Sequence, residues 1–247
     1  MTDSVPVTNS VPSAPRSLFR RRLTWFLSFL ALWAVGAYLL VPEGWYRYTK
    51  HHPALDDVPT ITYAKDGIPG DPLNVGVIGT ERELKLIMIA AHWYPADPLT
   101  LKSCLEIAEA TVLKRPYDEA PVSNLFLWHR KEDLAFEKPV GKDPRQRHHV
   151  RFWKSDKLDS DGRPVWLGSA TYDRAVGLSH TTGQITHHIA ADIDAERNGL
   201  IADWQKTGRC DEVYTVQDFQ KAKSGRNGGG DPWETDGNLK VGVLKPE

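Results

Sequence analysis

The sequence predicts an α+β fold, a mixed α/β domain that follows a single N-terminal transmembrane helix. Three observations lead to this prediction. Residues 23–42 carry no charge, short apolar runs bounded by turn residues recur along the rest of the chain, and helical capping patterns stand between some of those runs. We therefore expect one mixed-sheet domain with about three helices and an antiparallel hairpin.

Composition excludes several classes of protein. The 247 residues are 40% hydrophobic and 26% charged, which is typical of a globular chain and not of a multi-spanning or largely disordered one. Lys and Arg number 31 against 32 Asp and Glu, so no nucleic-acid partner is expected. The two cysteines, Cys104 and Cys210, are too few for a disulfide scaffold, and whether they pair stays open.

The uncharged stretch 23–42 is long enough to cross a membrane. As a helix, its 20 residues reach about 30 Å, the thickness of the hydrocarbon layer. A cleaved signal peptide is the competing interpretation, and a buried core helix is a third. We favour an uncleaved anchor because the small residues Ala34, Gly36 and Ala37 are followed by more apolar chain, not by a cleavage site.

The flanking charges predict the orientation and divide the chain. Residues 1–22 carry a net charge of +3 and lack apolar periodicity, which predicts a disordered cytoplasmic tail, and residues 43–247 carry −4. The C-terminal domain is then extracytoplasmic, in the cell envelope. Residues 43–70 are rich in Pro, Gly, His and Asp and are expected to form a connector to a domain over 71–247.

Helices are predicted at three places in the domain. Thr80 and Glu83 form a capping box before an apolar stripe that ends ahead of Pro95. A second helix is expected from about Thr100, with Cys104 on its apolar face. A third begins near Asp192 or Asp194, and Gly208 suits its C-terminal end.

Strands are predicted between and after these helices, over residues 73–78, 124–129, 147–154, 164–173, 212–218 and 239–244. The Asp161-Gly162 turn predicts that the third and fourth of them form an antiparallel hairpin. Residues 224–238, with three consecutive glycines, are expected to be a flexible loop.

The strand over 147–154 has one polar face. Period-2 alternation places on it Arg145, Arg147, His149 and Arg151. If Trp153 pairs with Val165, then the residues facing His149, Arg147 and Arg145 are Ser169, Thr171 and Asp173. Arg suits bidentate binding of phosphate or carboxylate. The alternative is the solvated side of a half-exposed sheet.

Six of the nine histidines form adjacent pairs, and two pairs, His148-His149 and His187-His188, lie in the domain. Imidazole and carboxylate groups suit a divalent metal or acid–base chemistry near neutral pH. Adjacent strand residues point to opposite faces, so at most one histidine of each pair is expected to reach a given site. No His-Glu-x-x-His, Cys-x-x-Cys, phosphate-loop or nucleophile-elbow pattern is present, so the cofactor stays open, with a divalent metal as the class to test.

Three long segments of the chain resemble the LssY C-terminal domain family. They are DPLNVGVIGTERELKLIMIAAHWYPAD, APVSNLFLWHRKEDLAFEKPVGKDPRQRHHVRFWK and GRPVWLGSATYDRAVGLSHTTGQITHHIAADIDAERNGLIADW, and the resemblance covers roughly Asp71 to Gln220. It implies a bacterial membrane-associated protein, hence an inner-membrane location, and supplies no catalytic residues. The family also occurs fused to phosphatase-like membrane regions that this chain lacks.

Two functions are expected from these residues. The first is an envelope module that binds a phosphorylated or lipid-head-group ligand at the bilayer, with hydrolysis of that ligand as an extension. Its expected catalytic residues are His149, His188 and Asp173, its ligand-binding residues Arg145, Arg147, Arg151 and Arg174, and its metal ligands His148 and His187. The second is a non-catalytic periplasmic module that binds another protein.

Overall fold

The computed structural model describes residues 18–44, 60–65, 67–96, 124–141 and 146–247. Its helices are α1 (Leu18–Val35), which continues into a π-helical turn η1 (Gly36–Leu40), α3 (Glu81–Ala90) and α5 (Ile193–Lys206). Its strands are β1 (Ile61–Tyr63), β2 (Pro69–Pro72), β3 (Val75–Ile78), β4 (Tyr94–Pro95), β5 (Phe126–Leu127), β6 (Arg130–Lys131), β7 (Leu134–Pro139), β8 (Arg147–Leu158), β9 (Pro164–Leu178), β10 (Ile185–Ile189), β11 (Cys210–Val216), β12 (Ser224–Arg226), β13 (Pro232–Glu234) and β14 (Leu239–Leu244). The α+β prediction is confirmed.

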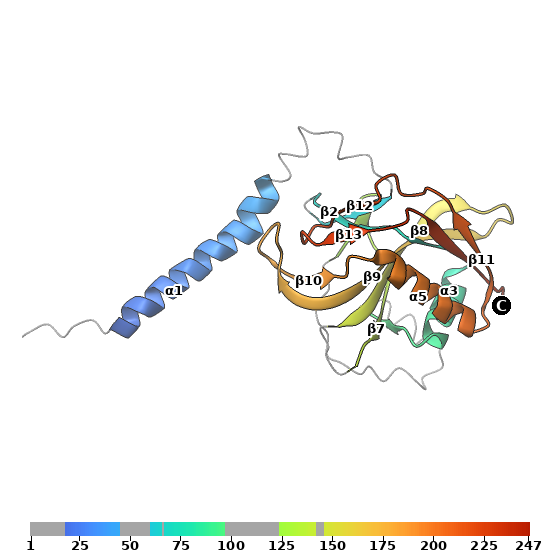
Figure 1. Cartoon of the computed structure of the whole chain (residues 1–247), viewed down its shortest axis with the longest axis horizontal. Helices are drawn as coiled ribbons and strands as arrows, with labels where there is room; N and C mark the ends of the chain where they lie inside the picture. The colour runs from blue at the N-terminus through green and yellow to red at the C-terminus, as the bar shows by residue number, and fades with distance from the viewer. Residues whose placement is uncertain (1–17, 45–59, 66, 97–123, 142–145) are drawn as a thin grey trace, which may run out of the picture.

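An eight-stranded sheet organises the domain (Figure 1). Its order is β11-β14-β3-β9-β8-β7-β4, with β10 paired to the C-terminal part of β9. The β14–β3 pair is parallel and the other pairs are antiparallel. A four-stranded sheet in the order β2-β1-β5-β6 and the β12–β13 hairpin complete the strands described.

Each of the two domain helices begins at a side chain that accepts hydrogen bonds from backbone N–H groups of the first turn, which have no partner within the helix. Thr80 accepts from Glu83 N–H and Glu83 accepts from Thr80 N–H, so the predicted capping box is confirmed. The Asp192 side chain caps α5 by accepting from Asp194 N–H and Ala195 N–H, and Gly208 follows the last turn with a φ of 70°. Both helices pack on one face of the large sheet, where the main core lies.

The four-stranded sheet covers the part of the opposite face of the large sheet that includes β8. Leu125 and Leu127, from the segment around β5, form a second core cluster with Leu73 and with Trp153 of β8. Trp153 shares a face with Arg147, His149 and Arg151 by strand alternation. The polar face of β8 is therefore covered as well, and the solvated-face alternative is wrong.

Several local predictions need correction. The β8–β9 hairpin is confirmed, but Trp153 pairs with Leu167 and not with Val165, so Arg147 faces Asp173 and His149 faces Thr171. The strand expected over 124–129 is interrupted, because Trp128 and His129 adopt positive φ values and turn β5 back into β6. The expected loop 224–238 contains the β12–β13 hairpin. The expected helix from Thr100, together with Cys104, lies outside the described residues, and Cys210 is a free thiol.

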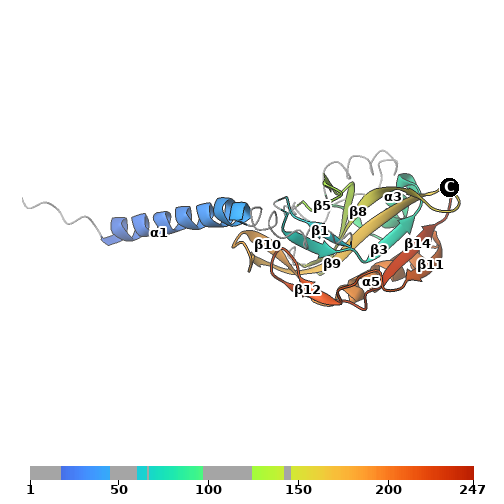
Figure 2. The ribbon, with the colours of Figure 1, turned by 90° about the horizontal axis from the view of Figure 1, so that it is seen from above.

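The N-terminal helix projects from the domain as a rod (Figures 1 and 2). Residues 20–44 form the one helix of the described chain that is long and apolar enough to cross a membrane. Its C-terminal part contacts the turn between β9 and β10: Trp33 Nε1 donates to Gly183 O at 3.1 Å, and Ile185 N–H donates to the Tyr38 hydroxyl at 3.2 Å.

A third contact depends on the π-helical turn. Val41 N–H donates to Gly36 O, five residues earlier, and the next residue, Pro42, has no N–H to continue this pattern to Ala37 O. The Ala37 carbonyl instead accepts a hydrogen bond from Gln184 Nε2 at 2.8 Å. The domain thus supplies a donor that the helix lacks.

Candidate functional site

A buried ionic cluster lies between the two sheets. We use this name for Arg147, Arg151, Glu137, Asp71, Asp173 and His187, which come from β8, β7, β2, β9 and β10. The adjacent strands β7, β8 and β9 bring Glu137, Arg147 and Asp173 together, because Arg147 pairs across with Asp173 and sits diagonally from Glu137.

Arg147 is the centre of this cluster. Its Nη1 lies 2.8 Å from Glu137 Oε2, its Nε lies 3.1 Å from Asp173 Oδ2, and its Nη2 donates to His187 Nε2 at 3.0 Å. Arg151 forms the second pair, with Nη1 at 3.6 Å from Asp71 Oδ2. These pairs compensate charges that burial would otherwise make very unfavourable.

Burial changes the proton affinity of this cluster more than the ion pairs do. Removal from water raises the pKa of Asp173 to about 6 against the opposing effect of Arg147, and it raises the pKa of Asp71 against that of Arg151. Burial together with Arg147 lowers the pKa of His187 to about 4, so this imidazole is neutral at physiological pH. Asp173 is therefore poised to exchange a proton near neutrality.

A cavity of about 310 Å³ opens onto this cluster. Arg151, Asp71, Asp173 and His187 lie on its wall. The remaining walls come from the β1–β2 segment, from residues 124–126, from the turn after β9 with Ser179, Thr182 and Gln184, and from the glycine-rich segment 227–229. The cavity combines a guanidinium, hydroxyl groups and carboxyl groups with a few apolar side chains, a composition that suits a polar ligand.

The predicted residues divide between this cavity and other places. His149 is 1% exposed and does not line the cavity. Its Nε2 has no hydrogen-bond partner in the described part of the chain. Burial lowers the pKa of this imidazole well below the usual range. His148 lies on the opposite face of β8, where Nδ1 contacts Glu196 Oε2 at 2.8 Å. Arg145 lies outside the described residues.

His187 and His188 have separate partners, as expected for neighbours on a strand. His187 joins the buried ionic cluster, whereas His188 Nδ1 lies 2.8 Å from Asp231 Oδ1. Arg174 is near this second place: its Nη2 lies 3.6 Å from Asp231 Oδ1, and its Nε donates to Ile189 O. The two residues expected as metal ligands, His148 and His187, are thus held by different groups.

Sequence reasoning missed Asp71, Glu137 and Asp231. Asp71 is the first residue of the expected domain, Glu137 lies on β7, which was not predicted, and Asp231 lies in the expected flexible loop. Of the three, Asp231 follows three consecutive glycines, and Gly and Asp together are typical of a tight turn.

The fold and the cavity define a class, an α+β domain with an ionic cavity that follows an apolar N-terminal helix long enough to cross a membrane. Residues 55–239 match the family model described as LssY C-terminus. The chain belongs to this family, as the resemblance predicted. Comparison with curated proteins and with solved structures gives no match.

Proposed function

We propose that this protein is a membrane-anchored module that binds the anionic head group of a membrane-derived amphiphile in the cavity. One observation carries the proposal: the turn between β9 and β10 both lines the cavity and contacts the apolar helix. Gln184 and Ile185 belong to the cavity wall, and the same two residues bond to Ala37 and Tyr38 of the helix. A ligand residing in the bilayer would meet this wall first.

The chemistry of the cavity supports an anionic group. Arg151 presents a guanidinium, which binds phosphate or carboxylate oxygens in a bidentate manner. Ser179 and Thr182, which carry hydroxyl groups, also line the cavity. The neighbouring carboxyl groups oppose an anion when ionised, but the raised pKa of Asp173 keeps part of that group neutral near pH 6.

Apolar side chains at the end of the hairpin support a lipid origin of the ligand. Leu178 and Ile185 are cross-strand partners, and both are exposed. They lie at the turn that contacts the helix, where an exposed aliphatic pair fits the boundary between head groups and acyl chains. The flanking arginines Arg20, Arg21 and Arg22 support a cytoplasmic N-terminus, and with it the proposal that the domain lies on the extracytoplasmic side of the inner membrane.

The variant Arg151→Gln is expected to weaken binding of phosphatidylglycerol by about 10- to 100-fold, since a charge-assisted hydrogen bond is lost. The full chain in nanodiscs is titrated with phosphatidylglycerol, phosphatidylcholine and glycerol 3-phosphate. Tighter binding of phosphatidylglycerol than of phosphatidylcholine indicates that the protein recognises the anionic head group. Tighter binding of phosphatidylglycerol than of glycerol 3-phosphate indicates that the ligand comes from the bilayer.

The matched control is Arg209→Gln, which removes an exposed arginine far from the cavity lining. Arg151→Lys keeps the positive charge but loses the planar guanidinium group. Its affinity for phosphatidylglycerol is expected to lie between those of the wild type and Arg151→Gln. Equal binding by wild type and by a correctly folded Arg151→Gln variant contradicts the proposal. Conversion of the bound lipid in the same assay would indicate hydrolysis, the second candidate function, for which Asp173 is the group able to exchange a proton.

Affinity for phosphatidylglycerol is expected to fall as the pH rises through about 6. Burial raises the pKa of Asp173, so the carboxyl group is neutral below that pH and adds a negative charge beside the ligand above it. A phosphodiester keeps a single charge over this range, so the ligand contributes no titration of its own. Binding measured from pH 5 to 8 checks this, and Asp173→Asn is expected to flatten the profile; a profile unchanged by that substitution would assign the dependence to another group.

A further inference from the structure

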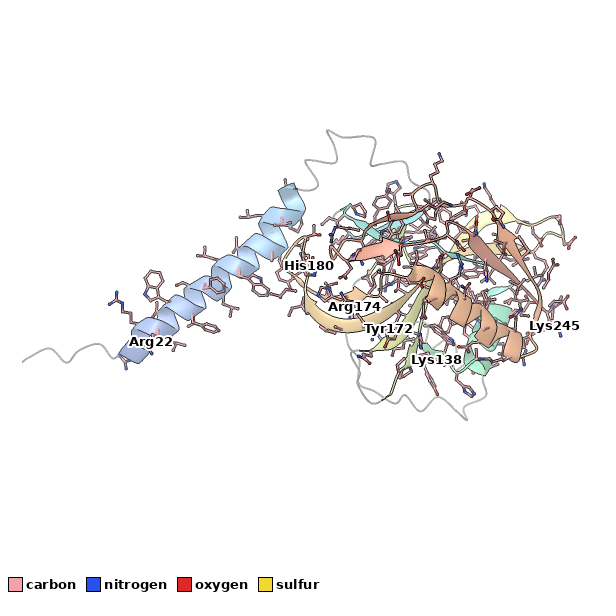
Figure 3. The ribbon with its side chains drawn as sticks, viewed as in Figure 1. Arg22, Lys138, Tyr172, Arg174, His180 and Lys245 are labelled. Carbon is pink, nitrogen blue, oxygen red and sulfur yellow. The ribbon has the colours of Figure 1, made fainter. Side chains whose placement is uncertain are left out.

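Three potential metal ligands converge on the side of β10 away from the buried ionic cluster. The histidine–aspartate cluster consists of His180, His188 and Asp231, and one ligand atom from each lies within 4.8 Å of the other two. The Asp231 side chain is fully buried, His188 is 12% exposed and His180 is exposed. Figure 3 shows His180 at the turn after β9.

The glycine-rich segment brings these three residues together. Gly230 has a φ of 83°, and a Cβ atom there would stand 2.6 Å from His180 Cβ, so only glycine fits. His180 N–H donates to Gly229 O at 2.7 Å, which fixes the turn against this segment. At Gly177 a Cβ would stand 2.7 Å from His188 Nε2, so this second glycine leaves room for the imidazole.

The chemistry of the set is that of a transition-metal site. Two imidazole nitrogens and a carboxylate oxygen are ligands that zinc prefers, at about 2.0–2.2 Å from the ion, which separates the ligand atoms by about 3.4 Å. His188 Nδ1 and Asp231 Oδ1 are already 2.8 Å apart, and the exposed His180 ring can close the remaining gap by rotation. We propose that His180, His188 and Asp231 bind a divalent transition metal of the zinc type, with a fourth position open to solvent.

Arg174 fits this proposal because its guanidinium balances the charge of Asp231 when no metal is bound. It stands 3.6 Å from the buried Asp231 carboxylate, yet its side chain is 53% exposed, so it can move into solvent when an ion arrives. The site also borders the cavity: Asp231 N–H donates to Asn227 Oδ1 at 3.0 Å, and Asn227 Nδ2 donates to Asp71 Oδ1 at 2.9 Å. An ion on Asp231 would therefore fix the segment that forms one wall of the cavity.

The experiment measures metal binding directly and does not depend on the lipid. The full chain in detergent, freed of any affinity tag and stripped with a chelator, is titrated with Co²⁺ while its visible absorption is recorded, and Zn²⁺ is then added to displace the cobalt. We expect one equivalent of metal per chain, and at least tenfold weaker binding in His180→Ala. Because His180 is exposed, that variant is expected to keep the wild-type melting temperature.

The matched control is His129→Asn, which removes an exposed histidine elsewhere and suits its positive φ. It is expected to bind metal as the wild type does. Asp231→Asn tests the buried ligand, with circular dichroism reporting its fold. Absence of stoichiometric binding by the wild type, or wild-type affinity in His180→Ala, overturns the proposal.

Discussion

Replacing Arg147 with methionine is expected to destabilise the domain by about 3–5 kcal/mol, the range for removing one partner of a buried ion pair. The guanidinium contacts Glu137, Asp173 and His187, and all three interactions are lost at once. Glu137 and Asp173 then lose the guanidinium that lies 2.8 Å and 3.1 Å from their carboxylate oxygens. Urea unfolding followed by tryptophan fluorescence measures the change in free energy.

The effect of Arg147→Met is expected to shrink at low pH. Loss of a positive neighbour raises the pKa of a buried carboxyl group, so its neutral form, which costs less to bury, predominates below that pKa. Adding Glu137→Gln to Arg147→Met is expected to recover part of the loss at pH 7. The control Arg209→Gln is expected to stay within about 0.5 kcal/mol of the wild type, as exposed substitutions usually do. A loss from Arg147→Met below about 1 kcal/mol would mean that water reaches the buried ionic cluster.

Asn74→Asp is expected to cost about 3 kcal/mol or more at pH 7, although it replaces a single NH2 group with oxygen. The buried Asn74 amide donates to Ala170 O at 2.9 Å and to Ile193 O at 3.0 Å, and it accepts from Ala170 N–H. It thereby joins the segment before β3 to β9 and to the start of α5. A carboxylate there would face two carbonyl oxygens without a donor between them.

The sign of the pH dependence identifies this mechanism. A buried aspartate has a raised pKa, so its cost is small while the carboxyl group is protonated and grows as the pH rises above the unfolded value of about 4. The stability of the Asn74→Asp variant, measured by thermal unfolding, should therefore fall relative to wild type from pH 4 upward. Asn198→Asp is the matched control, because Asn198 is exposed on α5 beside Arg197. A constant difference between Asn74→Asp and wild type across this range would exclude ionisation as the cause.

Local patterns predicted much of the fold because their physical causes are local. The capping box at Thr80 placed the start of α3, and strand alternation placed Arg147, His149 and Arg151 on one face. The register of β8 against β9 was wrong by two residues. A shift of two keeps each side chain on its face, so the polar face was predicted correctly while its cross-strand partners were not.

Burial of that face could not be read from the sequence. It depends on the four-stranded sheet, whose strands have two to four residues each and two of which, β1 and β2, lie far from β8 in the chain. The same reason explains the acidic partners that were missed. Asp71 meets Arg151 from 80 residues away in the chain, and the pairing follows only once the two sheets are packed.

The hydrogen bond from Gln184 to the Ala37 carbonyl fixes the orientation of the domain relative to the apolar helix. If the helix spans a bilayer, as proposed, breaking this bond would leave a carbonyl without a donor in hydrocarbon, which costs several kcal/mol. Tilting of the helix would then move the turn that forms part of the cavity wall. A change in bilayer thickness that tilts the helix would therefore reorient the cavity entrance.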